Sequence, residues 1–313
     1  MPLDPVLASV LDLMASSGAP ALSSGTPEQA RDGFRMMTVG LRDAATLAQV
    51  GDVVDRVIDG PVGKIAIRIY RPRTDGPHPT VVFLHGGGFV IGDLDTHDDH
   101  ARLICRDVDA VVVSVAYRLA PEAPFPAGVE DCVAAYRWVV ANAADLGGDV
   151  TRLAVAGDSA GGNLAAAVAL TARDAVLPMA AQLLLYPGVD FVDSDDHRSR
   201  VENAEGFFLT ADDMRWFGEH YLQGTSTGDP RASVLRAENL AGVAPVVIGT
   251  AEYDPLRDEG EAYAAALHKA GVAVVQHRYA GLIHGFFGLG HVSPACAAAN
   301  AELCADLKVL LSV

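Results

Sequence analysis

A serine between two glycines is the first residue with the context of a nucleophile. Ser159 stands at the centre of the pentapeptide G-D-S-A-G at 157–161, after the apolar run Leu153–Ala156 and before a helical pattern over 160–173. A strand, a tight turn and a helix in this order present the hydroxyl outward, at a helix N-terminus that favours negative charge. The alternative is a glycine-rich turn in which Ser159 caps the helix. The pattern predicts nucleophilic chemistry at Ser159, provided that partners exist elsewhere in the chain.

Three consecutive glycines, in the string H-G-G-G-F at 85–89, follow the apolar run Thr80–Leu84. Glycines leave backbone N–H groups unshielded, so this loop is expected to bend around an oxyanion. A flexible turn is one alternative. A phosphate-binding loop is another, which the acidic stretch Asp93–Asp99 and the lack of a following Gly-Lys-Ser/Thr disfavour. We expect His85 to fix this loop and not to act as a base, because it precedes the nucleophile in the chain.

The best candidate for a general base is His284, in the string G-L-I-H-G-F after the apolar run Ala273–Gln276. A histidine beside glycine, on a loop that leaves a strand, can reach over an active site. The alternative is a surface histidine. Three others compete for the role, of which His268 and His277 lie within expected regular elements and His291 stays open.

The acid that orients this base is expected at Asp254, between the apolar run Pro245–Ile248 and a helix expected to start at Pro255. An aspartate before a proline at the first helical position is also a good N-cap, and both roles can coexist. Glu252 and Asp258 are alternatives. Asp258 falls inside the first helical turn, where it would complement the helix dipole.

The three candidates occur in the order Ser159, Asp254 and His284, each after a successive strand and with a glycine-rich loop upstream. This is the order found in α/β-hydrolases. Because the carboxyl ends of parallel strands meet at one edge of a sheet, three such loops can bring their side chains together. The sequence therefore predicts a serine–histidine–aspartate triad that attacks an acyl group.

The elements that must hold these loops follow an α/β pattern. Alternation over 64–70 predicts a half-buried antiparallel strand. Short apolar runs predict strands covered on both faces, at Thr80–Leu84, Ala110–Val115, Leu153–Ala156, Gln182–Leu185, Pro245–Ile248 and Ala273–Gln276. Helical patterns separate them, at 97–107, 127–144, 160–173, 255–270 and 294–311. The alternation predicts a three-layer sandwich with a mostly parallel sheet of about eight strands.

Two segments depart from this alternation and predict a helical cap on a catalytic domain over 51–313. Residues 1–50 have a helical pattern, and an insertion at about 190–225 is polar and then helical, with Thr210 and Asp213 placed as a capping box. The bulky cap residues are expected to line an acyl pocket: Phe34, Phe207, Phe208, Met214 and Phe217. For each of them, ordinary packing inside the cap is the alternative. Met36 and Met37 are expected to be buried.

The composition restricts the partners. The net charge is -17 at pH 7, and so acidic a surface disfavours nucleic acid and anionic lipid. No apolar run reaches membrane-spanning length and no Lys or Arg precedes Arg31, so neither stable membrane insertion nor a secretory signal is expected. Cys296 and Cys304 lie about 12 Å apart on one expected helix, too far for a disulfide. Together with Cys105 and Cys132, they favour a reducing compartment, and we expect a cytoplasmic protein.

Several separated motifs resemble those of the hormone-sensitive-lipase-like esterases, in particular their GDSAG-type members, the bacterial carboxylesterases. In chain order they are H-G-G-G-F at 85–89, Y-R-L-A-P-E at 117–122 with F-P-A at 125–127, G-D-S-A-G-G-N at 157–163, D-P-L-R-D-E at 254–259 and H-G-F at 284–286. The resemblance implies an oxyanion hole formed by the N–H groups of Gly86, Gly87 and Ala160. It also implies short to medium acyl esters as substrates, no metal or cofactor, and cis peptides before Pro121 and Pro126.

The expected activity is therefore a serine carboxylesterase acting on a small-molecule ester. An amidase or deacetylase with the same triad is the first alternative, because the sequence does not separate the two. A small-molecule receptor on the same fold is the second, and the complete triad disfavours it. The sequence leaves open whether the chain forms a homodimer.

Overall fold

Among the residues that the computed structural model describes, 2–18 and 21–312, eight strands form one sheet. In chain order they are β1 (Asp52–Asp59), β2 (Lys64–Arg71), β3 (His78–Leu84), β4 (Val111–Ala116), β5 (Gly148–Asp158), β6 (Ala181–Leu185), β7 (Val246–Tyr253) and β8 (Val274–Ile283). In space the order is β1-β2-β4-β3-β5-β6-β7-β8. β2 pairs antiparallel with both β1 and β4, and all other pairs are parallel. The predicted three-layer, mostly parallel α/β architecture is confirmed, and β1 is a strand that the sequence analysis did not single out.

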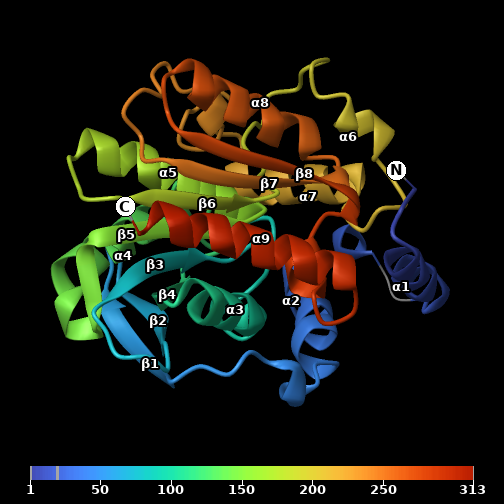
Figure 1. Ribbon diagram of the computed structural model, residues 1–313. Coiled ribbons are helices and arrows are strands. Elements are labelled where there is room, and N and C mark those ends of the chain that lie inside the picture. The colour runs from blue at the N-terminus through green and yellow to red at the C-terminus, as the bar shows by residue number, and fades with distance from the viewer. Residues whose placement is uncertain (1, 19–20, 313) are drawn as a thin grey trace.

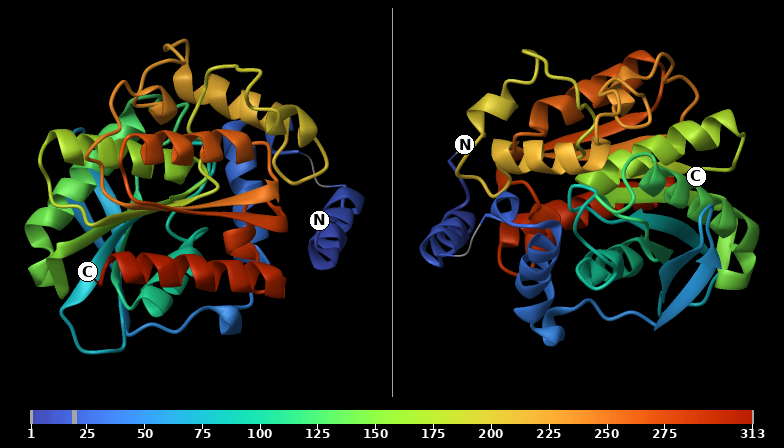
Figure 2. Two further views of the ribbon diagram at one scale, coloured as in Figure 1. Left: turned by 45° about the horizontal axis from the view of Figure 1, so that its top comes forward. Right: turned by 180° about the vertical axis from the view of Figure 1, so that it is seen from behind.

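Helices cover both faces of this sheet. On one face lie α3 (Asp98–Val108) and α9 (Pro294–Leu310), and on the other lie α4 (Ala127–Asn142), α5 (Ala160–Asp174) and α8 (Arg257–Lys269). In the left view of Figure 2 the sheet separates the orange α8 from the red α9. Short 3-10 turns occur at Leu22–Ser24, Ala44–Thr46, Ala144–Leu146, Val234–Arg236 and Phe286–Leu289, and a π-helical turn at Met36–Gly40.

The central strand β3 shows why these strands read as continuous apolar runs. All of its residues are buried. Val82 and Leu84 pack in the cluster with α4, α5 and α8, whereas Val81 and Phe83 pack in the cluster with α3 and α9. Successive side chains of a strand point to opposite faces, so both sets must be apolar when both faces are covered.

The strands β7 and β8 extend further than their apolar runs predicted. β7 continues to Tyr253 and β8 to Ile283, so that Asp254 and His284 follow their strands directly. The extra length of β8 contains polar residues because β8 is the last strand of the sheet and is only half buried along Val274–Ala280. The helix α8 begins at Arg257 and not at the predicted Pro255.

The N-terminal segment folds as two helices and turns. α1 covers Pro5–Ser16 and α2 covers Pro27–Arg35, both at the end of the sheet where α9 begins (Figure 1). The predicted burial of Met36 is wrong: its exposed fraction is 62%, and it begins the π-helical turn Met36–Gly40 that follows α2. Arg31 in α2 donates to the backbone oxygens of Val90 and Ala120, which attaches this segment to the loops after β3 and β4.

The segment over 190–225 contains α6 (Ser199–Glu202) and α7 (Ala211–Leu222). The predicted capping box of Thr210 and Asp213 is present at the start of α7. Asp213 also accepts the Ser23 N–H at 3.1 Å, so the segment over 190–225 contacts the N-terminal segment. Arg200 lies 2.6 Å from the buried Glu259 of α8, which anchors this segment to the sheet domain.

The four cysteines are free and buried. The peptides before Pro121 and Pro126 are cis, as the resemblance implied, and so is the peptide before Pro77. No helix within the described residues combines the length and apolar character needed to cross a bilayer.

Candidate active site

Ser159 lies on a sharp elbow between β5 and α5. Its backbone has φ 54° and ψ -119°, a conformation that L-residues rarely adopt. The glycines on either side are required by close backbone approach. A Cβ on Gly157 would lie 2.1 Å from the Gly161 oxygen, and a Cβ on Gly161 would lie 2.0 Å from the Leu84 oxygen. The spacing of the pentapeptide is thus a steric requirement of the elbow.

A continuous chain of hydrogen bonds joins the three candidate catalytic residues. The His284 Nε2 lies 3.0 Å from the Ser159 Oγ, and the His284 Nδ1 lies 2.8 Å from the Asp254 Oδ2. Asp254 is fully buried and His284 is 6% exposed. Because an ionised carboxylate can only accept, Nδ1 carries the proton and Nε2 presents its lone pair to the serine hydroxyl. This is the protonation state that a general base needs.

The competing acids are engaged elsewhere. Glu252 accepts the Gly281 N–H at 2.7 Å, and Asp258 accepts the Ser199 N–H at 2.7 Å. Asp254 itself has a second bond, because its Oδ1 accepts the Leu256 N–H at 2.8 Å. The two expected roles, orienting the histidine and satisfying backbone at the start of α8, therefore coexist, although Leu256 takes the N-cap position itself.

The competing histidines also have other neighbours. His277, on β8, pairs with Asp306 at 2.7 Å, and the exposed His291 lies 3.1 Å from the Gly288 oxygen. His268 is exposed in the last turn of α8. The structure therefore brings His284, and none of these three, to the serine.

The glycine-rich loop differs from the prediction at Gly86. Its N–H donates to the Asp158 Oδ1 at 2.8 Å and so is not available to an oxyanion. Gly87, Gly88 and Ala160 line the same cavity as Ser159, and within residues 2–18 and 21–312 no acceptor is bonded to their N–H groups. The prediction for Gly86 is wrong, because a carboxylate 72 residues away occupies this donor. Gly88, which the sequence analysis omitted, also lines the cavity.

His85 is the residue directly before the three glycines of this loop. It is almost fully buried, its Nδ1 lies 2.8 Å from the Gly86 oxygen, and its ring stacks on Tyr117 with the centroids 4.3 Å apart. Burial, together with the nearby His97, lowers the pKa of His85 to about 4, so the ring is neutral at physiological pH. These contacts suit a side chain that holds a loop.

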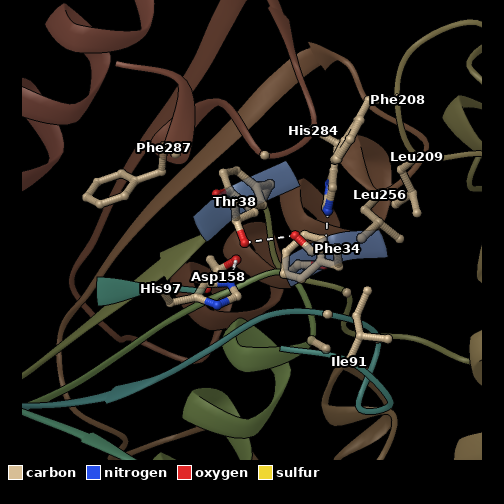
Figure 3. Close-up of a pocket in the computed structure, with 18 of the residues that line it drawn as sticks. Phe34, Thr38, Ile91, His97, Asp158, Phe208, Leu209, Leu256, His284 and Phe287 are labelled. Atoms are coloured by element: carbon tan, nitrogen blue, oxygen red, sulfur yellow. Dashed lines mark hydrogen bonds and ion pairs between the residues drawn. The ribbon is translucent and has the colours of Figure 1, made fainter. Parts of the chain in front are cut away.

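A cavity of about 1190 Å³ surrounds Ser159 and His284. Four of the five predicted pocket residues line it: Phe34, Phe208, Met214 and Phe217. Phe207 does not, because its ring packs against Tyr253 at a centroid distance of 4.8 Å. Figure 3 shows Phe208, Leu209 and Leu256 near His284 at one end and Phe287 at the other, with Phe34 and Thr38 between them.

The sequence analysis missed several lining residues. Thr38, Ile91, Leu256 and Phe287 face the cavity from four different segments. Leu256 follows Asp254 by two positions and Phe287 follows His284 by three, which was the available signal. No comparable signal marks Thr38 or Ile91.

Within the described part of the chain, one group of side chains has the types that ligate metals. Ligand atoms of His97, His100 and Asp158 lie within 4.8 Å of one another, and all three residues are buried. Each of these side chains is already hydrogen-bonded: His97 to Thr96, His100 to Asp99 and Asp158 to Gly86. His97 and Asp158 lie beside Phe34 and Thr38 in the cavity wall (Figure 3), and His100 also lines the cavity.

Known proteins are similar to this chain in sequence and in fold. A family model for the alpha/beta hydrolase fold matches residues 81–288. The carboxylic ester hydrolase LipN of Mycobacterium tuberculosis is 48% identical over 270 residues, covering 83% of this chain and 71% of that protein. The carboxylesterase NlhH of the same species is 40% identical over 317 residues, covering 98% and 95%. A solved hyperthermophilic esterase from the archaeon Pyrobaculum calidifontis is 41% identical, with a TM-score of 0.94 over 100% of both chains. The chain therefore belongs to the hormone-sensitive-lipase-like carboxylesterases of the α/β-hydrolase fold.

Proposed function

We propose that this carboxylesterase hydrolyses short to medium acyl esters through an acyl-enzyme on Ser159. The observation that carries the proposal is the hydrogen-bonded chain from Asp254 through His284 to Ser159. His284 takes the hydroxyl proton while the Ser159 Oγ attacks the ester carbonyl, and the Asp254 carboxylate stabilises the imidazolium that forms. His284 then gives the proton to the leaving alcohol, and water repeats the sequence on the acyl-enzyme.

The negative oxygen of the tetrahedral intermediate needs donors that are in place before the reaction. We assign this role to the N–H groups of Gly87, Gly88 and Ala160. Two observations support it: they line the cavity around Ser159, and no acceptor among the described residues is bonded to them. The Ala160 N–H opens α5, and the N-terminus of a helix favours negative charge. His85 holds this loop and takes no part in proton transfer.

The substrate is expected to lie under a cap formed by residues 1–50 and 190–225. Both segments contribute apolar side chains to the cavity, among them Phe34 from the first and Phe208, Met214 and Phe217 from the second. The contact of Ser23 with Asp213 supports their action as one unit. We also place the enzyme in the cytoplasm, since its four buried cysteines are free.

Replacing the nucleophile tests the proposal. Ser159→Ala should lower kcat for p-nitrophenyl butyrate by roughly 10⁶-fold, since only binding and the oxyanion hole then remain. The exposed Ser9→Ala in α1 is a matched control and should retain full activity. Circular dichroism should be used to check that both variants are folded. A folded Ser159→Ala with near wild-type turnover would exclude the acyl-enzyme.

A further inference from the structure

The backbone of Gly86 is held at both of its polar groups. Its N–H donates to the Asp158 Oδ1 at 2.8 Å, and its carbonyl oxygen accepts from the His85 Nδ1 at 2.8 Å. The Gly86 carbonyl and the Gly87 N–H belong to one planar peptide unit, so fixing one fixes the direction of the other. Gly87 carries one of the donors assigned above to the oxyanion hole.

The carboxylate of Asp158 lies directly against this loop. A Cβ added to Gly86 would lie 2.4 Å from the Asp158 Oδ2, and a Cβ on Gly87 would lie 2.3 Å from the Ile91 oxygen. The loop is therefore confined between Asp158 on one side and its own later backbone on the other.

Asp158 is itself in contact with a buried histidine, His97. The His97 Nε2 lies 3.6 Å from its Oδ2, and the Thr96 hydroxyl lies 2.9 Å from the His97 Nδ1. The His97 ring also lies 5.3 Å from that of His85, so both groups that hold Gly86 share one buried neighbour. Burial alone would raise the pKa of Asp158, but His97, His100 and the Gly86 N–H outweigh it and lower the pKa well below its usual range.

We infer that Asp158, the residue before the nucleophile, is a positioning residue that aims the Gly87 and Gly88 N–H groups at the reacting carbonyl, with His97 as its support. The inference rests on the proposed function. Donors placed for the tetrahedral oxyanion act on the transition state more than on the bound ester. Loss of Asp158 must therefore lower kcat and leave KM almost unchanged.

The opposite effect is expected if Asp158 acts only through its charge. A carboxylate near the active site repels a developing oxyanion, so its neutralisation would then raise the rate. Asp158→Asn separates the two cases, because the amide oxygen can still accept the Gly86 N–H while the charge is gone. Positioning predicts that this variant keeps a rate within about tenfold of the wild type and does not exceed it.

The experiment compares Asp158→Ala, Asp158→Asn and the control Asp131→Ala on p-nitrophenyl butyrate. Asp131 is also buried and also accepts a loop N–H, that of Arg118, but it lies outside the cavity. Asp158→Ala should lose roughly 10²-fold in kcat with KM changed less than about threefold. Its affinity for a trifluoromethyl ketone, whose serine adduct carries an oxyanion, should fall by a similar factor. Asp131→Ala should lower the melting temperature and leave both values near wild type.

Three results would overturn the inference: a folded Asp158→Ala with wild-type kcat, a loss confined to KM, or an equal loss of kcat in Asp131→Ala. If Asp158→Ala does not fold, His97→Gln replaces it. That variant should lose about tenfold in kcat, with the same proportional loss of ketone affinity, and an unchanged rate would overturn the inference. Failure of the proposed function is distinguishable, since it requires activity in Ser159→Ala.

Discussion

Asp254→Asn tests the triad most sharply, because the structure determines how the new amide must lie. Asp254 uses its two oxygens separately: Oδ1 accepts the Leu256 N–H and Oδ2 faces the His284 Nδ1, each at 2.8 Å. An amide has one oxygen and one NH₂ group. If the oxygen stays with Leu256, the NH₂ faces His284 and imposes the tautomer whose Nε2 carries a proton. That tautomer cannot accept the serine proton.

The reverse placement leaves the buried Leu256 N–H without an acceptor, which costs about 1–3 kcal/mol. The active arrangement is then populated at roughly one part in 10 to 100. It also lacks the carboxylate charge that stabilises the imidazolium, a hydrogen bond to a charged group worth about 1.5–3 kcal/mol, or another factor of roughly 10 to 100. The two factors multiply to an expected fall of roughly 10²–10⁴ in kcat, and the corresponding change in another triad costs about 10⁴.

The assay is steady-state hydrolysis of p-nitrophenyl butyrate by wild type, Asp254→Asn and the control Asp258→Asn. Asp258 also accepts a backbone N–H, that of Ser199, near the start of α8. The control should lose less than tenfold. Thermal melting separates the two roles of Asp254, because the favoured placement keeps the bond to Leu256. A folded Asp254→Asn within tenfold of wild type, or one that loses stability and keeps its turnover, would refute the orienting role.

Three further predictions concern the base and the pocket. His284→Ala should cost about as much as Ser159→Ala, whereas His85→Ala should retain measurable activity; the reverse outcome in steady-state assays would reassign the base. Phe208→Ala, at the cavity wall, should change KM for longer acyl chains. Phe207→Ala should lower the melting temperature and leave KM within about twofold. Equal effects of the two variants on KM would contradict the finding that only Phe208 of this pair lines the cavity. Rates on p-nitrophenyl esters with acyl chains of two to sixteen carbons should fall steeply beyond about eight carbons. Each methylene buried in the pocket stabilises the bound ester by about 0.8 kcal/mol, but a chain longer than the pocket must displace cap side chains, and such overpacking costs about 1–3 kcal/mol. A maximum at sixteen carbons would indicate a cap that opens for long chains.

The elbow and the positions of the covered strands along the chain could be predicted because their signals lie in the local sequence. Gly157 and Gly161 stand within one pentapeptide, and a Cβ on Gly157 would lie 2.1 Å from the Gly161 oxygen. The covered strands are equally recognisable, because both faces of β3 must be apolar. By contrast, the ends of β7 and β8 contain polar residues, and their apolar runs alone gave strands that stop too early.

The oxyanion loop shows where local reasoning fails. Three consecutive glycines offer three equivalent N–H donors, and nothing within the string distinguishes them. What distinguishes them is Asp158, the last residue of β5, whose carboxylate accepts the first of the three N–H groups. The residue stood inside the predicted nucleophile motif, but its side chain points to a loop that is remote in sequence, and only the parallel pairing of β3 with β5 brings the two together.

The cap is the part whose chemistry depends most on three-dimensional detail. Phe207 and Phe208 are adjacent, equally bulky and equally apolar, yet one packs on Tyr253 and the other faces the cavity beside His284. The difference follows from the backbone, since Phe208 has φ 75°, in a region that a bulky residue rarely adopts. A side chain at this φ leaves the chain in a direction that no alternation or helical period predicts. The rare conformation places an aromatic ring next to Gly285, 3.4 Å from where a Cβ would stand, and so closes the cavity beside the base. Strain of this kind persists only where the surrounding structure holds it, and the ring of Phe208 lies against Gly285 in the loop that carries His284.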